Sequence, residues 1–360
     1  MKIAFIGLGL MGGSIAKALK KSNPSNQIIA IDRDEASLKA ALDLNVIDYG
    51  SGVIDENLSS CDVIFLCAPV NNNASMLADI AKYIKKDAIL TDIGSVKEPI
   101  HEFVKEAGLV EYFVGGHPMA GSEKSGFINS SEILLENAFY ILTTDDKDEK
   151  RLNVMTKLID DIGAIPIHLN PSEHDLYTAG ISHLPHLVAA ALVELVREND
   201  GPEEYMRLIA AGGFKDITRI ASSNPTMWQQ ICDENADNIH ILLNKYIDLL
   251  KKIDEKLLSD NDYIYELFDV AGNYRLSFSD ISNGPIKKLS CLYCDIADES
   301  GAIANVATIM AKANISLKNI GIINSREFED GVLRLEFADE ALKKSAEDIL
   351  RKNNYTVHVR

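Results

Sequence analysis

Short apolar runs alternate with helical patterns along the first half of the chain. The apolar runs cover residues 3–6, 28–31, 63–66, 88–91, 139–142 and 165–168. The helical patterns cover residues 14–21, 35–44, 74–84, 99–107 and 149–162. This rhythm of strand and helix is typical of a largely parallel sheet with helices on both faces. Residues 1–169 are therefore predicted to form one α/β domain.

The pattern changes at Asn170. Asn170-Pro171-Ser172-Glu173 has the order of a helix start, with an N-cap, a proline at the first position and a glutamate at the third. Long apolar faces at helical spacing then cover residues 173–198, 203–211, 226–230, 235–258 and 262–275. Residues 170–278 are therefore predicted to form an all-helical bundle domain, whose apolar faces need partners within one subunit or between subunits.

The remaining residues show a third pattern. Residues 279–288 are rich in turn formers and predict a linker. Residues 289–360 then read as strand 289–296, helix 302–313, strands 315–322 and 332–337, helix 340–352 and strand 355–359. This βαββαβ order predicts a small α+β domain of the ferredoxin-like type.

Composition narrows the class of protein. The 360 residues carry a net charge of −18, which argues against nucleic acid and anionic membranes as partners. No uninterrupted apolar run reaches the roughly 18 residues of a membrane span. The five cysteines form no disulfide-type pattern, which favours the cytoplasm. Cys291 and Cys294 form C-x-x-C within a predicted strand, so they face opposite sides, and no metal is expected there.

A glycine-rich turn directly follows the first predicted strand. Gly7, Gly9 and Gly12 form G-x-G-x-x-G at the start of a helix, where a tight turn and unpaired N–H groups receive a pyrophosphate. Asp32 ends the second strand, where an acid binds the adenosine ribose. The arrangement predicts a Rossmann-type domain that binds NAD. Arg33 leaves NADP open, because an arginine here suits a 2′-phosphate.

The predicted cofactor set also includes the turn after the strand at residues 63–66, although an ordinary strand-to-helix turn explains that segment equally well. The predicted contacts are Gly7, Leu8, Gly9, Met11, Gly12, Asp32, Arg33, Ala68 and Pro69.

Three polar segments are candidates for chemistry. The first, residues 91–97, follows a strand of the parallel sheet, where ligands usually bind, and contains Ser95. The second, residues 115–123, is rich in glycine and places His117 just after a strand predicted at residues 112–114. The third begins at His174-Asp175 and includes SHLPH at residues 182–186, on the first long helix.

Hydride transfer from an alcohol needs a base for the hydroxyl proton, and a neutral imidazole accepts one near pH 7. A metal pair at His183 and His186 is discounted, because no carboxylate–histidine spacing completes such a site. Four histidines are interpreted as structural: His101, His168, His240 and His358.

Lys215 and Arg219 supply positive charge. They lie four residues apart on a predicted helix and are able to clamp carboxylates, the arginine in bidentate fashion. The alternative is a solvated helix face. Because the protein is acidic, an anionic substrate requires such a local basic group.

Five segments together resemble the prephenate dehydrogenase family of tyrosine biosynthesis. They are GLGLMGGSIAKAL at residues 7–19, DIGSVK at 92–97, GGHPMAGSEKSG at 115–126, SHLPH at 182–186 and GFKDITRIASSNPTMW at 213–228. The resemblance covers essentially the whole chain. It implies NAD-dependent oxidative decarboxylation of prephenate to 4-hydroxyphenylpyruvate and a homodimer formed through the helical domain.

The resemblance also implies roles for individual residues. His117 would accept the hydroxyl proton, Ser95 would orient hydroxyl and imidazole, and Arg219 would bind a substrate carboxylate. His186 would contact substrate or nicotinamide, and Glu123 would gate or polarise the pocket. The implied substrate-binding set is Arg219, His186, Glu123, Ser122 and Lys215. Trp228 either lines this pocket or packs in the core.

The C-terminal pattern, with its turn at residues 298–304 and Ala313-Asn314-Ile315, resembles an ACT regulatory domain. This implies feedback inhibition by an amino acid, most naturally tyrosine. The implied effector contacts are Asp298, Gly301, Ala302, Asn314 and Ile315. An ACT domain that only dimerises is the alternative.

Three rival functions remain. Arogenate dehydrogenase performs the same reaction on a substrate with an amino group, and the absence of an extra acid near Arg219 beyond Asp216 slightly favours prephenate. A β-hydroxyacid dehydrogenase is expected to carry a catalytic lysine where this chain has SHLPH. A sensor of NAD and amino acids would not need Ser95, His117, His186 and Arg219 together.

Overall fold

The computed structural model describes residues 1–68, 70–121, 124–144, 149–278, 290–297, 299–323 and 331–358. The chain divides into two compact units, Met1–Lys252 and Ile253–Arg360. The predicted linker at residues 279–288 lies outside the described residues, as do four predicted site residues: Pro69, Ser122, Glu123 and Asp298.

A five-stranded parallel sheet forms the core of the first unit. Its strands follow the spatial order β3-β2-β1-β4-β5. Their bounds are β1 (Lys2–Ile6), β2 (Gln27–Ile31), β3 (Tyr49–Ser51), β4 (Val63–Leu66) and β5 (Ile89–Asp92). The order reverses on either side of β1, which is the arrangement that binds dinucleotides at the carboxyl ends of its strands.

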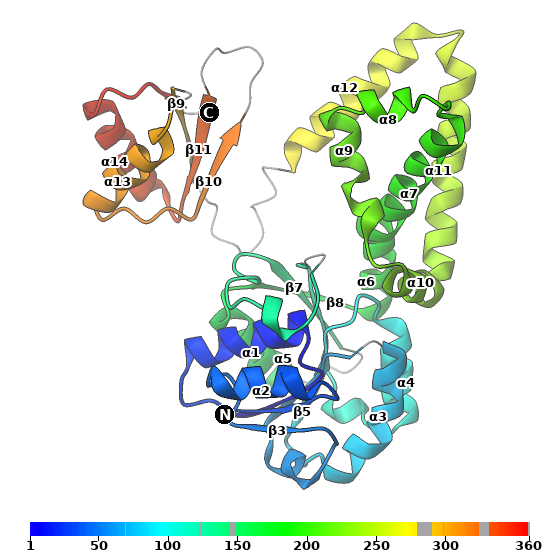
Figure 1. Cartoon of the computed structure of the whole chain (residues 1–360), viewed down its shortest axis with the longest axis vertical. Coiled ribbons are helices and arrows are strands. Elements are labelled where there is room, and N and C mark those ends of the chain that lie inside the picture. The colour runs from blue at the N-terminus through cyan, green and yellow to red at the C-terminus, as the bar shows by residue number, and fades with distance from the viewer. Residues whose placement is uncertain are drawn as a thin grey trace. The chain divides into compact units, whose positions relative to one another are not determined.

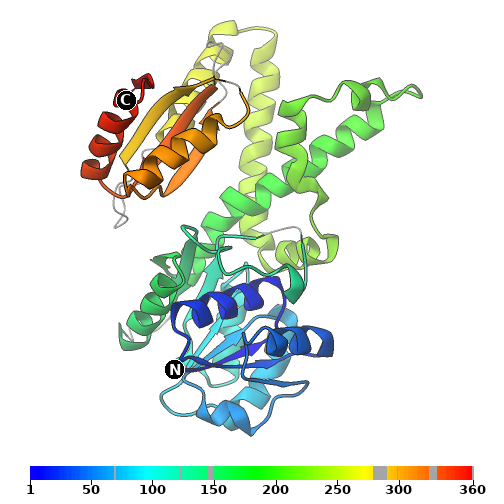
Figure 2. The same ribbon diagram turned by 60° about the vertical axis from the view of Figure 1, so that its left-hand side comes forward.

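Helices cover both faces of this sheet. The helices are α1 (Leu10–Ser22), α2 (Glu35–Asp43), α3 (Val70–Tyr83), α4 (Glu98–Glu106) and α5 (Glu149–Asp161). Ile3 and Phe5 of β1 pack in a core with α1, α2 and α5, whereas Ala4 and Ile6 pack with α3 and α4. Figures 1 and 2 show α1 and α2 in dark blue on the opposite side of the sheet from α3 and α4. The predicted α/β layering is therefore confirmed.

A second, three-stranded sheet adjoins β5 and corrects one prediction. It comprises β6 (Gly115–Pro118), β7 (Phe139–Thr143) and β8 (Ile165–Leu169), with β6 antiparallel to β7 and β7 parallel to β8. The strand predicted at residues 112–114 is wrong, because Val110–Tyr112 forms a 3₁₀ turn and His117 lies inside β6. Gly115 and Gly116 lack the side chains whose alternation marks a strand.

The helical part begins as predicted. Asn170 caps α6 (Pro171–Thr178), and Glu173 completes a capping box. The single helix predicted over residues 173–198 is interrupted by a π-helical segment at Ala179–His183, and α7 (Leu184–Asn199) follows. Pro185 provides the cause, since it lacks an N–H and its ring crowds the carbonyl four residues earlier.

The next helix is shorter than predicted. The helix predicted over residues 203–211 is only α8 (Tyr205–Ile209), because Ala211 is extended and Gly212 starts α9 (Gly212–Thr218). A 3₁₀ turn (Arg219–Ser222), α10 (Pro225–Glu234) and α11 (Ala236–Leu257) follow. Taken together, α6, the π-helical segment and α7 make a helical span, Pro171–Asn199, that is long and apolar enough to cross a membrane by length and composition, and 17% of its apolar window is buried.

The second unit contains α12 (Asn261–Ser277) and a four-stranded antiparallel sheet in the order β10-β11-β9-β12. Its elements are β9 (Ser290–Ile296), α13 (Ala302–Lys312), β10 (Asn319–Ile323), β11 (Gly331–Phe337), α14 (Glu340–Lys352) and β12 (Val357–His358). This confirms the predicted βαββαβ order. Cys294 is buried in the core and Cys291 lies on the other face against Arg334, as the strand alternation predicts.

Candidate active site

The glycine turn after β1 fits a dinucleotide. Gly7 has φ +99°, and a Cβ on Gly12 would lie 2.5 Å from the carbonyl oxygen of Gly7. A Cβ on Gly9 would meet no atom within 4 Å, so the backbone there is open to a ligand. Gly9 caps α1 without a side-chain hydrogen bond, which leaves the first N–H groups of the helix for a phosphate.

Asp32 connects this turn to the end of β2. Its Oδ2 accepts a hydrogen bond from the N–H of Leu8 at 2.6 Å, and its Oδ1 accepts one from Asp34 at 2.8 Å. The carboxylate is thus fixed at the sheet edge where a ribose would lie, and it disfavours the extra phosphate of NADP. Arg33 is exposed, and Ala68 follows β4 on the same edge of the sheet.

A buried ion pair joins β5 to β6. Lys97 and Asp92 are both fully buried, and the Lys97 ammonium bonds to the Asp92 carboxylate and, at 2.7 Å, to the carbonyl of Gly116. Asp92 also accepts hydrogen bonds from the N–H groups of Gly94 and Gly116. A Cβ on Gly116 would lie 2.5 Å from the Asp92 carbonyl, so only glycine fits. The pair therefore holds β6 against the carboxyl end of the parallel sheet.

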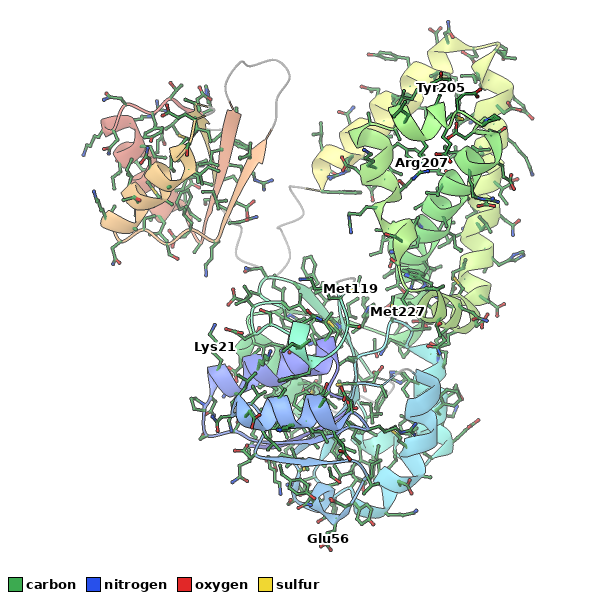
Figure 3. All side chains as sticks on the ribbon, in the orientation of Figure 1. Lys21, Glu56, Met119, Tyr205, Arg207 and Met227 are labelled. Carbon is green, nitrogen blue, oxygen red and sulfur yellow. The ribbon has the colours of Figure 1, made fainter. Side chains whose placement is uncertain are left out.

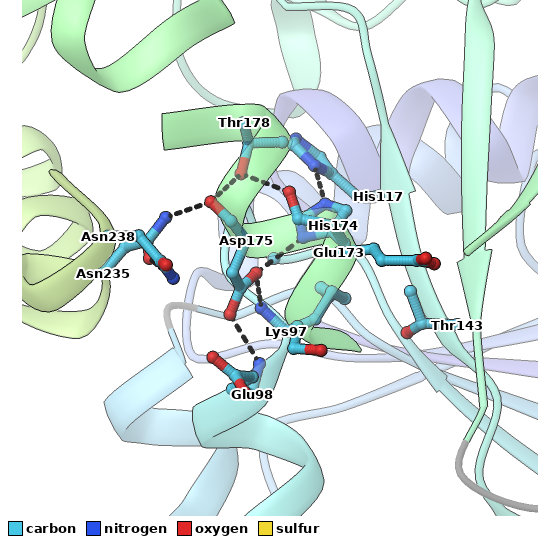
Figure 4. Close-up of polar contacts among 12 residues, drawn as sticks. Lys97, Glu98, His117, Thr143, Glu173, His174, Asp175, Thr178, Asn235 and Asn238 are labelled. Atoms are coloured by element: carbon cyan, nitrogen blue, oxygen red, sulfur yellow. Dashed lines mark hydrogen bonds and ion pairs between the residues drawn. The ribbon is translucent and has the colours of Figure 1, made fainter. Parts of the chain in front are cut away.

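His117 belongs to a chain of three side chains (Figure 4). Its Nδ1 lies 2.7 Å from Nε2 of His174, and Nδ1 of His174 lies 2.6 Å from Oδ1 of Asp175. The two oxygens of Asp175 accept the N–H groups of Lys97 and Glu98, at 2.7 and 2.8 Å, at the start of α4. The first turn of α6 thus reaches both β6 and the loop after β5.

Burial controls the protonation states of His117 and His174. Burial, together with electrostatic coupling to His174, Lys97 and His183, holds the pKa of His117 well below its usual range. Burial also lowers the pKa of His174, against the opposing effect of Asp175. Both imidazoles are therefore neutral at pH 7, which is the state in which His117 is able to accept a proton.

Asn235 and Glu234, at the end of α10, flank the hydrogen-bonded side chains of His117, His174 and Asp175. The Asn235 amide donates to the carbonyl of Asp175 at 2.8 Å and lies 3.1 Å from Nδ1 of His183. Burial lowers the pKa of His183 to about 4. Burial raises the pKa of Glu234 to about 7, although Lys97 opposes this shift.

His186 and Trp228 form an aromatic pair on the helical side. Their ring centroids are 3.7 Å apart at an interplanar angle of 24°, and Nδ1 of His186 lies 2.8 Å from the carbonyl oxygen of Ser182. Both side chains line a pocket of about 330 Å³ between α7, the 3₁₀ turn and α10. Trp228 is thus a pocket residue. Burial lowers the pKa of His186, and the charge of Arg219 acts in the same direction. Arg219 starts the 3₁₀ turn next to this pocket.

The structure brings together His117, the Ser95 loop and the start of α6, and it places His186 and Trp228 against one pocket. Ser95 is half-buried two residues before Lys97, and its hydrogen bond to His117 stays a prediction. Lys215 and Arg219 are exposed in the single chain, and their carboxylate-binding role also stays a prediction.

Sequence reasoning included Asp92, Lys97, His174 and Asp175 in its candidate segments but gave none of them a role, and it did not single out Asn235. A signal for two of them existed, since the predicted cap at Asn170 already placed His174 and Asp175 in the first turn of a helix. The four histidines interpreted as structural have other partners: Thr143 for His101, Thr156 for His168, Asn244 for His240 and Asp295 for His358.

Comparison with known proteins identifies the family. Residues 15–168 match the family model "Prephenate dehydrogenase, nucleotide-binding domain", and residues 170–270 match "Prephenate dehydrogenase, dimerization domain". Prephenate dehydrogenase of Bacillus subtilis is 37% identical over 355 residues, covering 97% of this chain and 95% of the relative.

Two solved structures share the fold over the 77% of this chain that each of them covers. Prephenate dehydrogenase of Aquifex aeolicus, in complex with hydroxyphenyl propionate and NAD+, is 34% identical with a TM-score of 0.72 and is covered over 98% of its length. Arogenate dehydrogenase of Synechocystis is 28% identical with a TM-score of 0.68 and is covered completely, at 100%. The chain therefore belongs to the prephenate dehydrogenase family.

Proposed function

We propose that this chain oxidises prephenate with NAD, releasing carbon dioxide and 4-hydroxyphenylpyruvate, with His117 as the catalytic base. One observation supports the role of His117 most directly. A half-buried, neutral imidazole lies in β6, which the Lys97–Asp92 pair holds at the carboxyl edge of the parallel sheet. The glycine turn and Asp32 occupy that same edge.

The chemistry assigns one task to each group. The substrate hydroxyl gives its proton to Nε2 of His117 while the C–H bond at the same carbon breaks, and bound NAD supplies the acceptor for that hydride. Cleavage of the bond to the ring carboxylate then places its electron pair in the ring, which becomes aromatic, and the phenolate oxygen takes a proton back. The chain must therefore orient a dianion and hold a proton at one atom.

Arg219 and Lys215 are proposed to bind the substrate carboxylates, and Ser95 to orient the hydroxyl. The fork of an arginine matches a carboxylate in bidentate fashion, which supports Arg219 for the tighter contact. His186 and Trp228, which line the same pocket, are proposed to contact the ring or side chain of the substrate. Ser122 and Glu123 are proposed to bind the substrate, with Glu123 gating or polarising the pocket.

Arogenate is the second candidate substrate, because the 28% identical Synechocystis structure is an arogenate dehydrogenase. The two substrates differ by an amino group, which an additional acid beside the pocket would recognise. Asp216 is exposed and lies on the same helix as Lys215. We favour prephenate because the sequence beside Arg219 contains no acidic residue beyond Asp216.

The assay that tests this proposal measures NADH formation by the full chain with prephenate and with arogenate in parallel. We expect turnover on prephenate and a slower reaction on arogenate. Turnover on arogenate alone would change the substrate but not the hydride chemistry. Bound NAD without turnover on either compound would contradict the proposed enzyme and favour a sensor.

The C-terminal βαββαβ unit is proposed to be an ACT domain that binds tyrosine. The Bacillus subtilis relative matches 97% of the chain, so it extends through this unit. Gly301 (φ +94°) and Asn314 (φ +57°) form left-handed turns at the two ends of α13, near the predicted contacts Ala302 and Ile315. Adding tyrosine to the same assay is expected to suppress turnover. No effect together with no calorimetric binding would leave a domain that only dimerises.

The helical region is proposed to form a homodimer, and the reaction to take place in the cytoplasm, where the five free cysteines stay reduced. Large apolar side chains are exposed on α7, α8 and α9 of the single chain: Leu195, Tyr205, Leu208, Ile209 and Ile217. Figure 3 labels Tyr205 and Arg207, which belong to α8. A partner of the same shape would cover this apolar surface, including that of the helix Pro171–Asn199.

Sedimentation in detergent-free buffer checks the dimer. We expect twice the chain mass of 39.6 kDa. Replacing Leu208 and Ile209, each 75% exposed, by glutamate should shift the mass towards the monomer. A wild-type monomer in water would contradict the proposal, and partition into detergent micelles would favour a membrane role for the apolar helix.

A further inference from the structure

We propose that His174 and Asp175 are positioning residues that fix which nitrogen of His117 carries the proton. In this arrangement Nδ1 of His117 bears the hydrogen and Nε2 keeps the lone pair that accepts the substrate proton. The inference rests on the proposed function for its purpose, but the protonation pattern itself is a property of the protein without substrate.

Asp175 determines which atom is the donor and which the acceptor in the hydrogen bonds that join it to His174 and His117. Its carboxylate accepts backbone N–H groups from Lys97 at 2.7 Å and Glu98 at 2.8 Å. These donors form the N-terminus of α4, where a negative charge is favoured. A carboxylate held in this way has no proton to give, so Nδ1 of His174, at 2.6 Å from Oδ1, must be the donor.

His174 extends the same order of donor and acceptor to its hydrogen bond with His117. It is completely buried, and its backbone carbonyl is tied to the Thr178 hydroxyl at 2.9 Å within α6. A neutral imidazole with hydrogen on Nδ1 presents only a lone pair at Nε2. That Nε2 lies 2.7 Å from Nδ1 of His117, which must therefore be the donor of the second hydrogen bond. Nε2 of His117 is left as an acceptor.

The opposite direction would require a protonated Asp175 or a charged His174. Among the described residues, charged and titratable groups beside His174 and Asp175 are Asp92 at the end of β5, Lys97 and Glu98 at the start of α4, His183 from the π-helical segment and Glu234 from α10. The nearest cation, Lys97, is fully buried and repels a second positive charge on His174. Burial of His174 acts in the same direction.

The arrangement also serves the step itself. When Nε2 of His117 takes the hydroxyl proton, the ring becomes a cation inside the protein. Its Nδ1–H then points at His174, which is itself hydrogen-bonded to the anionic Asp175. The positive charge is thus stabilised through two hydrogen bonds, and no group has to rotate before the proton is returned.

Nitrogen-15 NMR of histidine-labelled protein tests the pattern without substrate. The signals of His117 are assigned by their loss in His117→Asn. We expect one protonated nitrogen, Nδ1, and one unprotonated nitrogen, Nε2, at pH 7. A hydrogen on Nε2 of His117 would overturn the proposal, and this measurement on the wild-type chain does not depend on any variant that fails to fold.

Three variants connect the pattern to catalysis. His174→Phe keeps a ring but removes the acceptor, and we expect a mixture of His117 tautomers with a decrease in kcat of about tenfold or more, at unchanged NAD affinity. His174→Gln retains a donor and an acceptor and should keep more activity than His174→Phe. Tyr177→Phe, on the same helix but with a side chain that is 49% exposed, is the matched control and should keep the wild-type tautomer and rate.

The outcomes separate the two proposals. The expected NMR pattern in a protein that turns over neither substrate would leave the hydrogen-bond chain intact and contradict the proposed function. Full activity of His174→Phe, or an unchanged tautomer in that variant, would overturn the role of His174.

Discussion

Replacing His117 by asparagine is expected to lower kcat on prephenate by about 10²–10⁴-fold, the range typical of a lost general base. The side chain is held in β6 and its Nδ1 is hydrogen-bonded to His174, so its removal deletes the proton acceptor without disturbing the glycine turn. The dissociation constant of NAD should therefore remain that of the wild type. Initial rates of NADH formation and calorimetric titration with NAD measure the two quantities.

His168→Asn is the matched control, because His168 lies on the exposed side of β8 and bonds to Thr156. It should leave kcat unchanged. Turnover near the wild-type rate in His117→Asn would contradict the role of His117 as the catalytic base. The histidines of the helical region would then be the next candidates for that role.

The pH profile of the wild type follows from the same burial. Because the pKa of His117 lies well below its usual value, the base loses activity only when the pH falls below about 6.5. Glu234, with a pKa of about 7, ionises in the neutral range. Glu234→Gln should remove any step near pH 7 from kcat/KM and leave the acid limb of the profile in place.

Lys97→Met is expected to destabilise the first unit by about 3–5 kcal/mol, because it leaves the Asp92 carboxylate buried without its cation. Asp92 and Lys97 are both fully buried, and the ammonium also satisfies the carbonyl of Gly116. The midpoint of thermal unfolding should fall by roughly 10 °C for a unit of this size. Calorimetry or circular dichroism of the full chain measures the change.

The chain offers a matched control for this lysine. Lys105 also pairs with an acid, Glu102, but its side chain is 66% exposed on the surface of α4. Lys105→Met should change stability by less than about 0.5 kcal/mol. Adding Asp92→Asn to Lys97→Met should restore part of the loss. Equal effects of the two lysine substitutions would contradict the special cost of the buried pair.

The sequence predicts the cofactor end of this protein well because its determinants are local. G-x-G-x-x-G, the strand before it and Asp32 lie within one βαβ unit, and the structure joins Asp32 to Leu8 directly. The βαββαβ order of the C-terminal unit was predictable for the same reason, since the periodicity and turn residues of each strand and helix indicate that element locally.

The catalytic end was predicted only in part because its contacts are distant along the chain. Lys97 and Asp175 are 78 residues apart, and His117 and His174 are 57 apart. No local pattern indicates that the first turn of α6 reaches β6. Two glycines hid the strand that carries His117, and Pro185 divided a helix whose apolar periodicity is otherwise continuous.

The contact between His117 and His174 crosses the boundary between the two regions that match separate family models, residues 15–168 and 170–270. The halves of this enzyme are consequently not interchangeable modules. A nucleotide-binding half joined to a foreign helical partner would retain its glycine turn and Asp32, but His117, the proposed base, would lose the hydrogen-bond partner that we propose fixes its tautomer. Recombination between relatives should thus succeed only where the histidine and aspartate at the start of the helical half are inherited with it.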